Sequence, residues 1–277
     1  MTAFLASVAD LDEMDASLKA GVDILDLKNP TQGALGAWDR HDLVRAVRLI
    51  DGAKPISATI GDLSMEPQRL CAAVSETAAT GVDFVKVGFF PSDIFPGDIS
   101  PSNISPGNIF PGNIFPASNG GGDGRACAEA LGRCDRGAAR LVAVLFADQA
   151  PDFSLLEVLA ANGFSGVMLD TADKNGGGLR DYLEDNLLAR FVAAAAARGL
   201  FSGLAGSLSL DDALPLLELG PDYLGFRGAL CGAEGRRGNL DPHALGELVA
   251  VFRDWNASSP SRATATAGAQ IDACSLS

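Results

Sequence analysis

The sequence is poor in the residue types that several common kinds of site require. It has only two histidines, His41 and His243, and both fall inside helical patterns where we expect surface residues. The five cysteines are scattered and lack the spacing of a metal site, so we expect reduced thiols that mostly fill core space. These absences argue against a histidine-based catalytic triad and against a metal site.

Positive charge is also scarce, because 21 lysines and arginines face 35 aspartates and glutamates, for a formal net charge of -14. The average field of such a chain repels polyanions, which argues against binding to nucleic acid or to an anionic membrane. An anionic small substrate would therefore need a local cationic pocket. Neither a basic secretory signal nor an apolar run of membrane-spanning length is visible, so we expect a cytoplasmic protein.

Short apolar runs alternate with amphipathic helical patterns along residues 1–255, which is typical of βα units with parallel strands. Three of the helical patterns pass into a strand through Gly-x-Asp, at residues 21–23, 81–83 and 220–222. Eight units predict one α/β domain, a single (β/α)8 TIM barrel, with an open doubly wound sheet as the alternative. We place the strands at Ala3–Val8, Asp23–Lys28, Pro55–Ile60, Asp83–Gly88, Arg140–Phe146, Gly166–Asp170, Phe201–Ala205 and Tyr223–Arg227.

A low-complexity segment interrupts this alternation after the fourth strand. A five-residue unit that begins with proline repeats over residues 91–115, and residues 119–124 are rich in glycine. Proline at every fifth position suits neither a helix nor a strand, so we interpret residues 91–124 as a surface insertion. It is either a dispensable expansion or a lid over the barrel mouth. Residues 256–277, rich in Ser, Ala and Thr, are expected to form a disordered tail.

Charged residues occupy the ends of four predicted strands; the eighth strand ends in Arg227, and the other three carry lysines and aspartates. The second strand ends in Asp26 and Lys28, which share one face because side chains alternate along a strand. Lys86 lies on the fourth strand, and the sixth ends in Asp170, with Lys174 just beyond it. Because the carboxyl ends of barrel strands meet at one mouth, we expect these five side chains to lie close together.

Such a group of lysines and aspartates suits catalysis, although buried ion pairs also occur for structural reasons. An ammonium group in a partly dry pocket beside other cations loses its proton more readily, and the neutral amine can attack a carbonyl to form a Schiff base. One carboxylate can orient that amine while another acts as a general base. We therefore predict that Asp26, Lys28, Lys86, Asp170 and Lys174 are catalytic.

Two glycine-containing loops, after the seventh and eighth strands, are suited to phosphate. The first places Gly206 and Ser207 where backbone N–H groups at a helix start can bind an anion. The second does the same with Gly228, and Arg227 adds a charged fork. Phosphate sites after these two strands recur in barrels, so we predict that Gly206, Ser207, Arg227 and Gly228 bind substrate phosphate.

Five separated motifs occur together in order with suitable spacing. The motifs are Asp26-Leu-Lys28-Asn-Pro30 with Gly33-Ala-Leu-Gly36, Ser57-Ala-Thr-Ile-Gly-Asp62, Val85-Lys86-Val-Gly88, Met168-Leu-Asp-Thr171 with Lys174, and Gly225-Phe-Arg-Gly-Ala229. Together they resemble those of the (5-formylfuran-3-yl)methyl phosphate synthases, also called 4-(hydroxymethyl)-2-furancarboxaldehyde-phosphate synthases, of methanofuran biosynthesis. The pentapeptide segment and the tail depart from the family pattern.

This resemblance implies a lyase that condenses two molecules of glyceraldehyde 3-phosphate into a phosphorylated furan aldehyde, with loss of water and one phosphate and without a metal or organic cofactor. It implies that Lys28 forms the Schiff base and that Asp26, Lys86, Asp170 and Lys174 assist proton transfer and neutralise charge. Two alternatives stay open: a Schiff-base sugar-phosphate aldolase or isomerase, and a non-catalytic protein that binds phosphorylated metabolites. We expect a homo-oligomer that acts on a small triose phosphate.

Overall fold

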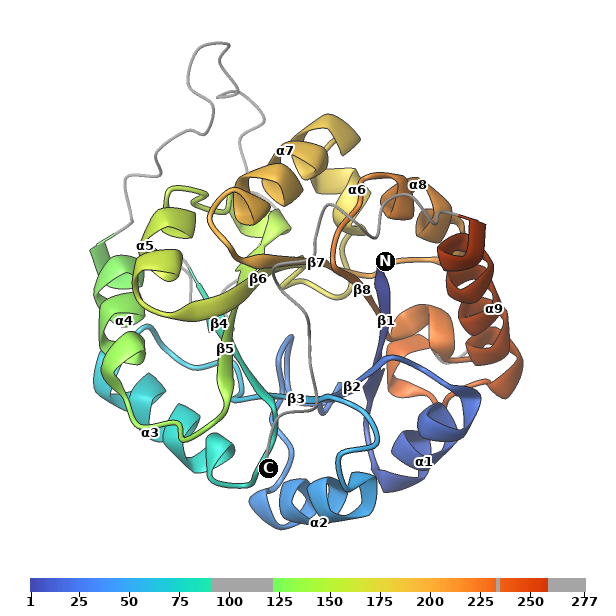
Figure 1. Cartoon of the computed structure of the whole chain (residues 1–277), viewed down its shortest axis with the longest axis horizontal. Coiled ribbons are helices and arrows are strands. Elements are labelled where there is room, and N and C mark those ends of the chain that lie inside the picture. The colour runs from blue at the N-terminus through green and yellow to red at the C-terminus, as the bar shows by residue number, and fades with distance from the viewer. Residues whose placement is uncertain (91–121, 233–234, 259–277) are drawn as a thin grey trace.

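The computed structural model describes residues 1–90, 122–232 and 235–258, in which eight parallel strands close into a barrel (Figure 1). Each strand pairs with its neighbours in sequence, and β8 pairs with β1. This closure confirms the predicted TIM barrel and excludes the open sheet. The strands are β1 (Ala3–Val8), β2 (Ile24–Leu27), β3 (Ile56–Thr59), β4 (Phe84–Phe89), β5 (Arg140–Phe146), β6 (Phe164–Asp170), β7 (Phe201–Leu204) and β8 (Tyr223–Phe226).

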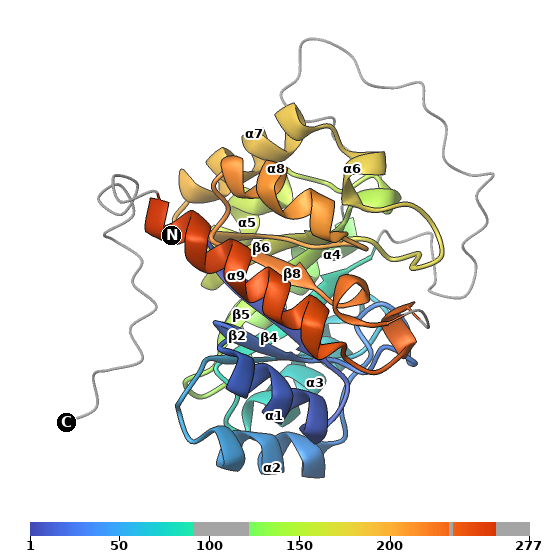
Figure 2. The same ribbon diagram turned by 90° about the vertical axis from the view of Figure 1, so that its right-hand side faces the viewer.

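Helices surround the barrel on its outside (Figures 1 and 2). The α-helices are α1 (Leu11–Ala20), α2 (Arg40–Ile50), α3 (Pro67–Ala78), α4 (Gly122–Arg133), α5 (Leu155–Ala161), α6 (Leu179–Tyr182), α7 (Asp185–Ala196), α8 (Ala213–Glu218) and α9 (Pro242–Ser258). Short 3-10 helices are η2 (Ala147–Gln149), η3 (Leu210–Asp212), η4 (Gly228–Leu230) and η5 (Gly235–Arg237).

Two predicted boundaries differ from the structure. Helix α4 begins at Gly122, so the insertion placed at residues 91–124 ends earlier than predicted. Helix α9 continues to Ser258, past residue 255, where we placed the end of the barrel domain. The remainder of the insertion and of the predicted tail lies outside the described residues.

Strand side chains alternate between two apolar layers. Leu25 and Leu27 point outward into the larger core between the sheet and the helices. Met168 and Tyr223 point inward and belong to a smaller cluster that fills the barrel interior. Glycine makes room for these large inner groups, since a Cβ atom on Gly203 would lie 2.2 Å from the Tyr223 ring. The interior cluster therefore forms an apolar floor beneath the polar groups at the carboxyl ends of the strands.

The repeated Gly-x-Asp junctions stabilise the opposite, amino end of the barrel. The amino-end aspartates, Asp23, Asp83 and Asp222, each accept a hydrogen bond from a backbone N–H of the preceding strand. The donors are Phe4 at 2.9 Å, Ile56 at 2.8 Å and Ser202 at 2.6 Å. Each aspartate also donates its own N–H to the carbonyl of that same residue. The recurring sequence pattern thus satisfies backbone groups at the strand starts that would otherwise lack partners.

Candidate functional site

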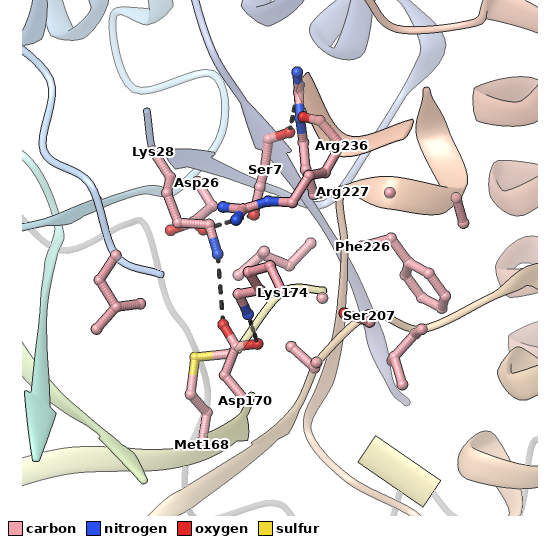
Figure 3. Close-up of a pocket in the computed structure, with 18 of the residues that line it drawn as sticks. Ser7, Asp26, Lys28, Met168, Asp170, Lys174, Ser207, Phe226, Arg227 and Arg236 are labelled. Carbon is pink, nitrogen blue, oxygen red and sulfur yellow. Dashed lines mark hydrogen bonds and ion pairs between the residues drawn. The ribbon is translucent and has the colours of Figure 1, made fainter. Parts of the chain in front are cut away.

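A cavity of about 390 Å³ lies at the carboxyl ends of the strands (Figure 3). Its volume falls in the range of roughly 300–1,000 Å³ that is usual for small-molecule sites. The structure brings together every site residue that the sequence predicts, although their roles stay predictions. The residues that line the cavity include Asp26, Lys28, Lys86, Asp170, Lys174, Gly206, Ser207, Arg227 and Gly228.

The cavity is positively charged although the chain as a whole is acidic. Five cationic side chains line it, the three predicted lysines together with Arg227 and Arg236, against the two carboxylates of Asp26 and Asp170. Glu13, which lies outside the lining, neutralises Arg227, so a surplus of two positive charges remains to attract anions, and the low-dielectric walls of a cleft focus that field. This is the local cationic pocket that an anionic substrate requires.

Asp26 is buried and is held by donors from three other strands, β1, β3 and β4. Ser7, Asp26 and Ser57 are register partners on β1, β2 and β3, so their side chains meet inside the barrel. Ser7 Oγ donates to Asp26 at 2.8 Å and Ser57 Oγ at 2.6 Å, and Lys86 Nζ lies 2.8 Å away. Burial raises the pKa of Asp26, but the ammonium groups of Lys86 and Lys28 outweigh it, so the pKa lies below its usual value.

Lys86 is correspondingly fixed by Asp26. Burial lowers the pKa of Lys86 from its usual value, the Asp26 carboxylate offsets only part of that effect, and the nearby Lys28 ammonium lowers the pKa further. The side chain of Lys86 is only 3% exposed. A proton on Lys86 is therefore less tightly bound than on a surface lysine, and it can be exchanged more readily.

Asp170 is the second carboxylate, and the side chains of Lys28 and Lys174 are both directed at it (Figure 3). Its Oδ1 atom lies 2.5 Å from Lys174 Nζ and accepts the Thr171 N–H at 2.8 Å, while Oδ2 lies 3.5 Å from Lys28 Nζ. Burial raises the pKa of Asp170, but Lys174 and Lys28 outweigh it and hold the pKa below its usual value. Burial lowers the pKa of Lys174 to about 8, although Asp170 opposes that shift.

The charged groups pair across strands and not along β2. We expected Asp26 to be the carboxylate beside Lys28, and both do line the cavity. The ion pairs, however, join Asp26 to Lys86 and Lys28 to Asp170, on β4 and β6 respectively. Lys28 has the longest lysine–aspartate contact of the three, so its amine is the least firmly held.

The loop that carries Lys174 is anchored by a buried carboxylate. Asp148, in η2 after β5, accepts the N–H of Ala172 at 2.8 Å and that of Asp173 at 2.7 Å. Charge-assisted hydrogen bonds of this kind are about twice as strong as neutral ones. Asp148 therefore fixes the chain immediately before Lys174, and with it the direction from which that ammonium group reaches Asp170.

The loop after β7 has the backbone that an anion site needs. Gly206 has φ 111° and Ser207 has φ 47°, a left-handed conformation that is uncommon for serine and that clusters at functional sites. A Cβ atom on Gly206 would lie 3.0 Å from the Thr171 nitrogen, so only glycine fits beside β6. Within the described residues, the N–H groups of Gly206, Ser207 and Gly228 make no hydrogen bond.

Arg227 has a different task from the one we predicted. A guanidinium group has five N–H donors. Those of Arg227 bond to both carboxylate oxygens of Glu13 and to the carbonyls of Ser7, Arg236 and Gly238. The side chain is 7% exposed and leaves no donor for a ligand. We therefore revise the expectation that Arg227 binds phosphate: it ties α1 to the loop after β8.

Sequence reasoning missed three contributors to the site. Ser7 is visible in principle, because it follows the inward-facing Leu5 by two positions on β1. Arg236 lies in a Gly-Arg-Arg-Gly stretch several residues beyond β8, where only the pairing of two basic residues between glycines gave a signal. Glu13 belongs to the outer helix α1, and nothing in the sequence links it to Arg227.

Histidine and metal chemistry were not expected. His41 and His243 lie on α2 and α9 with side chains 89% and 79% exposed, as predicted. Among the described residues, no three or more histidines, cysteines, aspartates or glutamates are grouped so as to hold a metal ion. In the same part of the chain, no helix combines the length and the apolar character needed to cross a membrane.

Fold and site together define a (β/α)8-barrel protein whose mouth holds buried lysine–aspartate pairs beside backbone N–H donors that have no partner in the described part of the chain. Comparison with known families takes this further. The chain belongs to the 4-HFC-P synthase family, whose model matches residues 4–95 and 120–249. All nine predicted site residues fall inside the two matched segments, whereas most of the pentapeptide repeat falls between them.

Relatives of similar length carry the same name. A Methylorubrum extorquens protein, provisionally named (5-formylfuran-3-yl)methyl phosphate synthase, is 37% identical, and the match covers 90% of this chain and 91% of that protein. The (5-formylfuran-3-yl)methyl phosphate synthase of Methanopyrus kandleri is 30% identical over 88% of this chain and 96% of its own. That of Methanosarcina barkeri is 32% identical, with coverages of 89% and 97%.

Solved structures resemble the chain in fold alone. Phosphoribosyl anthranilate isomerase from Thermus thermophilus has a TM-score of 0.56 and 13% identity, covering 92% of this chain and 99% of its own. A 3-hexulose-6-phosphate synthase has a TM-score of 0.51 and 17% identity, covering 89% and 98%. At these identities the likeness supports the barrel and carries no argument about substrate.

Proposed function

We propose that the chain is an enzyme that makes (5-formylfuran-3-yl)methyl phosphate from two molecules of glyceraldehyde 3-phosphate, with loss of one phosphate and of water. It is in this proposal a carbon–oxygen lyase whose product serves the biosynthesis of a methanofuran-type cofactor. Family membership and the names of the relatives support the product. The observation that carries the chemistry is the cluster of three ammonium groups and two carboxylates inside one cationic cavity.

Lys28 is the nucleophile in this proposal. Its amine lies 3.5 Å from Asp170, whereas Lys86 and Lys174 approach their carboxylates to 2.8 and 2.5 Å. A lysine that keeps a looser contact is freer to turn toward a carbonyl carbon. In its neutral form the Lys28 amine can attack that carbon.

Asp170 is better placed than Asp26 to act as the general base. Three donors already surround Asp26, which is 1% exposed. Asp170 keeps one oxygen, Oδ2, whose nearest donor is Lys28 at 3.5 Å. Once Lys28 becomes part of an imine, that oxygen is available to accept a proton from the adjacent carbon.

In the proposed reaction, two triose phosphates give one furan phosphate, one free phosphate and two water molecules. The Lys28 amine adds to the carbonyl of one triose phosphate and releases water, which forms an imine. Asp170 removes a proton from the neighbouring carbon, and the resulting enamine forms a carbon–carbon bond with the second aldehyde. Elimination of one phosphate, loss of two water molecules and ring closure give the furan, and hydrolysis of the imine, which takes up the water released when it formed, frees the lysine. The ammonium groups of Lys86 and Lys174 neutralise negative charge and exchange protons in these steps.

The first test is product formation by the purified full-length protein. Incubation with glyceraldehyde 3-phosphate should produce the absorbance of a furan aldehyde and one free phosphate per furan. An aldol product or isomer without furan would contradict the proposal and favour the Schiff-base aldolase or isomerase. Binding without turnover would favour a non-catalytic protein that binds phosphorylated metabolites.

The second test locates the Schiff base. Borohydride reduction in the presence of substrate should add mass to the peptide that contains Lys28, and the variant Lys28→Ala should not be labelled. Lys19→Ala is the matched control, because Lys19 is a surface lysine on α1 whose side chain is 74% exposed. Labelling that survives in Lys28→Ala would reject this assignment.

A further inference from the structure

We propose that Arg236 binds a phosphate group of the substrate and that Arg227, buried behind it, is the positioning residue that holds the Arg236 loop in place. The inference rests on the proposed function only for the identity of the molecule that carries the phosphate. The two arginines lie together at the edge of the cavity away from Met168 and Asp170 (Figure 3).

Arg236 is the cavity cation whose charge is least neutralised. Among the described residues, Lys28, Lys86, Lys174 and Arg227 each form an ion pair with a carboxylate, whereas Arg236 forms none. Its side chain makes one hydrogen bond there, from Nη2 to the carbonyl of Gly33 at 3.1 Å. The other donors of a fork suited to phosphate oxygens therefore stay available.

The backbone of the Arg236 loop is fixed from behind. Arg227 Nε donates to the Arg236 carbonyl at 2.8 Å, and Nη2 donates to the Gly238 carbonyl at 2.9 Å. Glu13 neutralises Arg227 by accepting from both of its terminal nitrogens. Arg227 thus holds η5 itself and the residue that follows it, so that the side chain of Arg236 is presented to the cavity.

The Gly33 carbonyl that accepts from Arg236 lies on a rigid segment, and a phosphate oxygen could take its place. Gly33 has φ 91°, and a Cβ atom there would lie 2.0 Å from Asp62 Oδ2. Asp62 accepts the next two N–H groups, of Ala34 at 2.7 Å and Leu35 at 2.8 Å. The Gly33 carbonyl is a neutral acceptor, and an ionised phosphate oxygen forms a stronger, shorter bond with guanidinium. A bound phosphate would therefore take the Arg236 donor from Gly33.

The electrostatic setting favours the same exchange. Burial lowers the pKa of Arg236, Asp170 offsets part of that effect, and the nearby Arg237 and Arg227 lower the pKa further. A dianionic ligand relieves this repulsion. Along the same cavity wall it would also find the N–H group of Gly228, on the segment that follows β8, which makes no hydrogen bond to any described residue.

The test uses three variants of the full-length protein: Arg236→Gln, Arg236→Lys and, as the matched control, Arg237→Gln. Arg237 is an exposed neighbour in the same loop that does not line the cavity, so its replacement removes the same charge from the rim. Calorimetric titration measures the binding of inorganic phosphate and of glyceraldehyde 3-phosphate. Steady-state kinetics of furan formation separate KM from kcat.

We expect Arg236→Gln to weaken phosphate binding and raise KM by about 10- to 100-fold, the usual effect of losing hydrogen bonds to a charged group. Arg236→Lys should lie between Arg236→Gln and the wild type, and Arg237→Gln should stay within about twofold of it. Circular dichroism checks folding. If Arg236→Gln does not fold, a loss of threefold or more in Arg236→Lys supports the proposal.

Two results would overturn the inference: affinity for phosphate that Arg236→Gln or a folded Arg236→Lys leaves unchanged, or no measurable phosphate binding by the wild type. Both are separable from failure of the proposed function. Phosphate binding that depends on Arg236 without furan formation rejects the proposed reaction and keeps the site. Furan formation with an unchanged KM in Arg236→Gln rejects the site and keeps the reaction.

Discussion

The two ends of this barrel both depend on aspartates but give them different partners. At the amino end, Asp23, Asp83 and Asp222 accept hydrogen bonds from backbone N–H groups of neighbouring strands. At the carboxyl end, Asp26 and Asp170 accept hydrogen bonds from lysine ammonium groups. A backbone donor cannot titrate, whereas an ammonium group can gain and lose a proton. Aspartates at the amino end therefore contribute to stability, and those at the carboxyl end are available for chemistry, the division that TIM barrels share.

The largest effect should come from the carboxyl end. Lys28→Ala should lower kcat for furan formation by ~10³-fold or more, as expected for the loss of a covalent nucleophile. The free energy of unfolding should stay within about 1 kcal/mol of the wild type, because Lys174 still neutralises Asp170 and one repelling cation is gone. Kinetics and urea denaturation measure the two quantities. A large loss of stability with intact activity in the folded fraction would mean that Lys28 serves stability and not chemistry, contrary to the proposed division between the two ends.

The converse substitution is Asp222→Ala at the amino end. It leaves the Ser202 N–H without its 2.6 Å acceptor, so the free energy of unfolding should fall by about 1–3 kcal/mol. The folded fraction should keep kcat within about twofold. Asp254→Ala is the control, because the Asp254 side chain is 71% exposed and should change neither quantity measurably. A kcat loss in Asp222→Ala that exceeds the loss of folded protein would contradict the division between the two ends.

The pH dependence of activity should originate at the carboxyl end. Burial lowers the pKa of Lys174 to about 8, so its ammonium form is present below that pH and is lost above it. Because the ammonium neutralises Asp170 and attracts phosphate, activity should fall as pH rises through about 8, by about tenfold at pH 9.

Two variants test the origin of this alkaline limb in kcat/KM profiles. Lys174→Arg keeps the positive charge and should move the limb to higher pH, whereas Asp222→Ala should leave it in place. If the alkaline limb does not move in Lys174→Arg, the fall in activity comes from the titration of another group.

The smallest effect should come from Ser57→Ala. Asp26 loses one neutral donor of three and still keeps Lys86 at 2.8 Å and the Ser7 hydroxyl. Asp26 stays ionised near neutral pH, so kcat should change by no more than about threefold. Ser7→Ala should behave alike, which gives an internal control. A loss of 100-fold in either variant would mean that the hydroxyl itself contacts substrate.

The sequence predicted which residues line the site better than it predicted which of them form ion pairs with one another. Alternation along strands and the convergence of parallel strand ends are enough to place Asp26, Lys86 and Asp170 inside one mouth. Neither rule says which strands face one another across the barrel. Residues two apart on one strand are separated by about 6.6 Å along it. Asp26 and Lys28 therefore pair with closer groups on other strands, Lys86 and Asp170 respectively.

The remaining features that the sequence did not predict depend on contacts between residues far apart in the chain. The bond between Arg227 and Glu13 joins residues 214 positions apart, on a strand end and an outer helix. Because Glu13 and three backbone carbonyls occupy all five donors of Arg227, this residue has none left for a phosphate, and Arg236 becomes the proposed ligand. The Gly-x-Asp repeats were recognisable in the sequence, but their role depends on strand register, which composition does not encode.

The seam between β1 and β8 also has a consequence for the order in which this molecule folds. Ala3 pairs with Tyr223, and Glu13 reaches Arg227, so the seam joins the first strand to the last. Closing so long a loop of chain carries a larger entropic cost than pairing successive strands. Lys28 and Lys86 can be in place on early strands before that closure. The rim that holds Arg236 is completed only when β8 docks beside β1, so the proposed binding site depends on closure of the barrel, whereas the strand that leads to the proposed nucleophile does not.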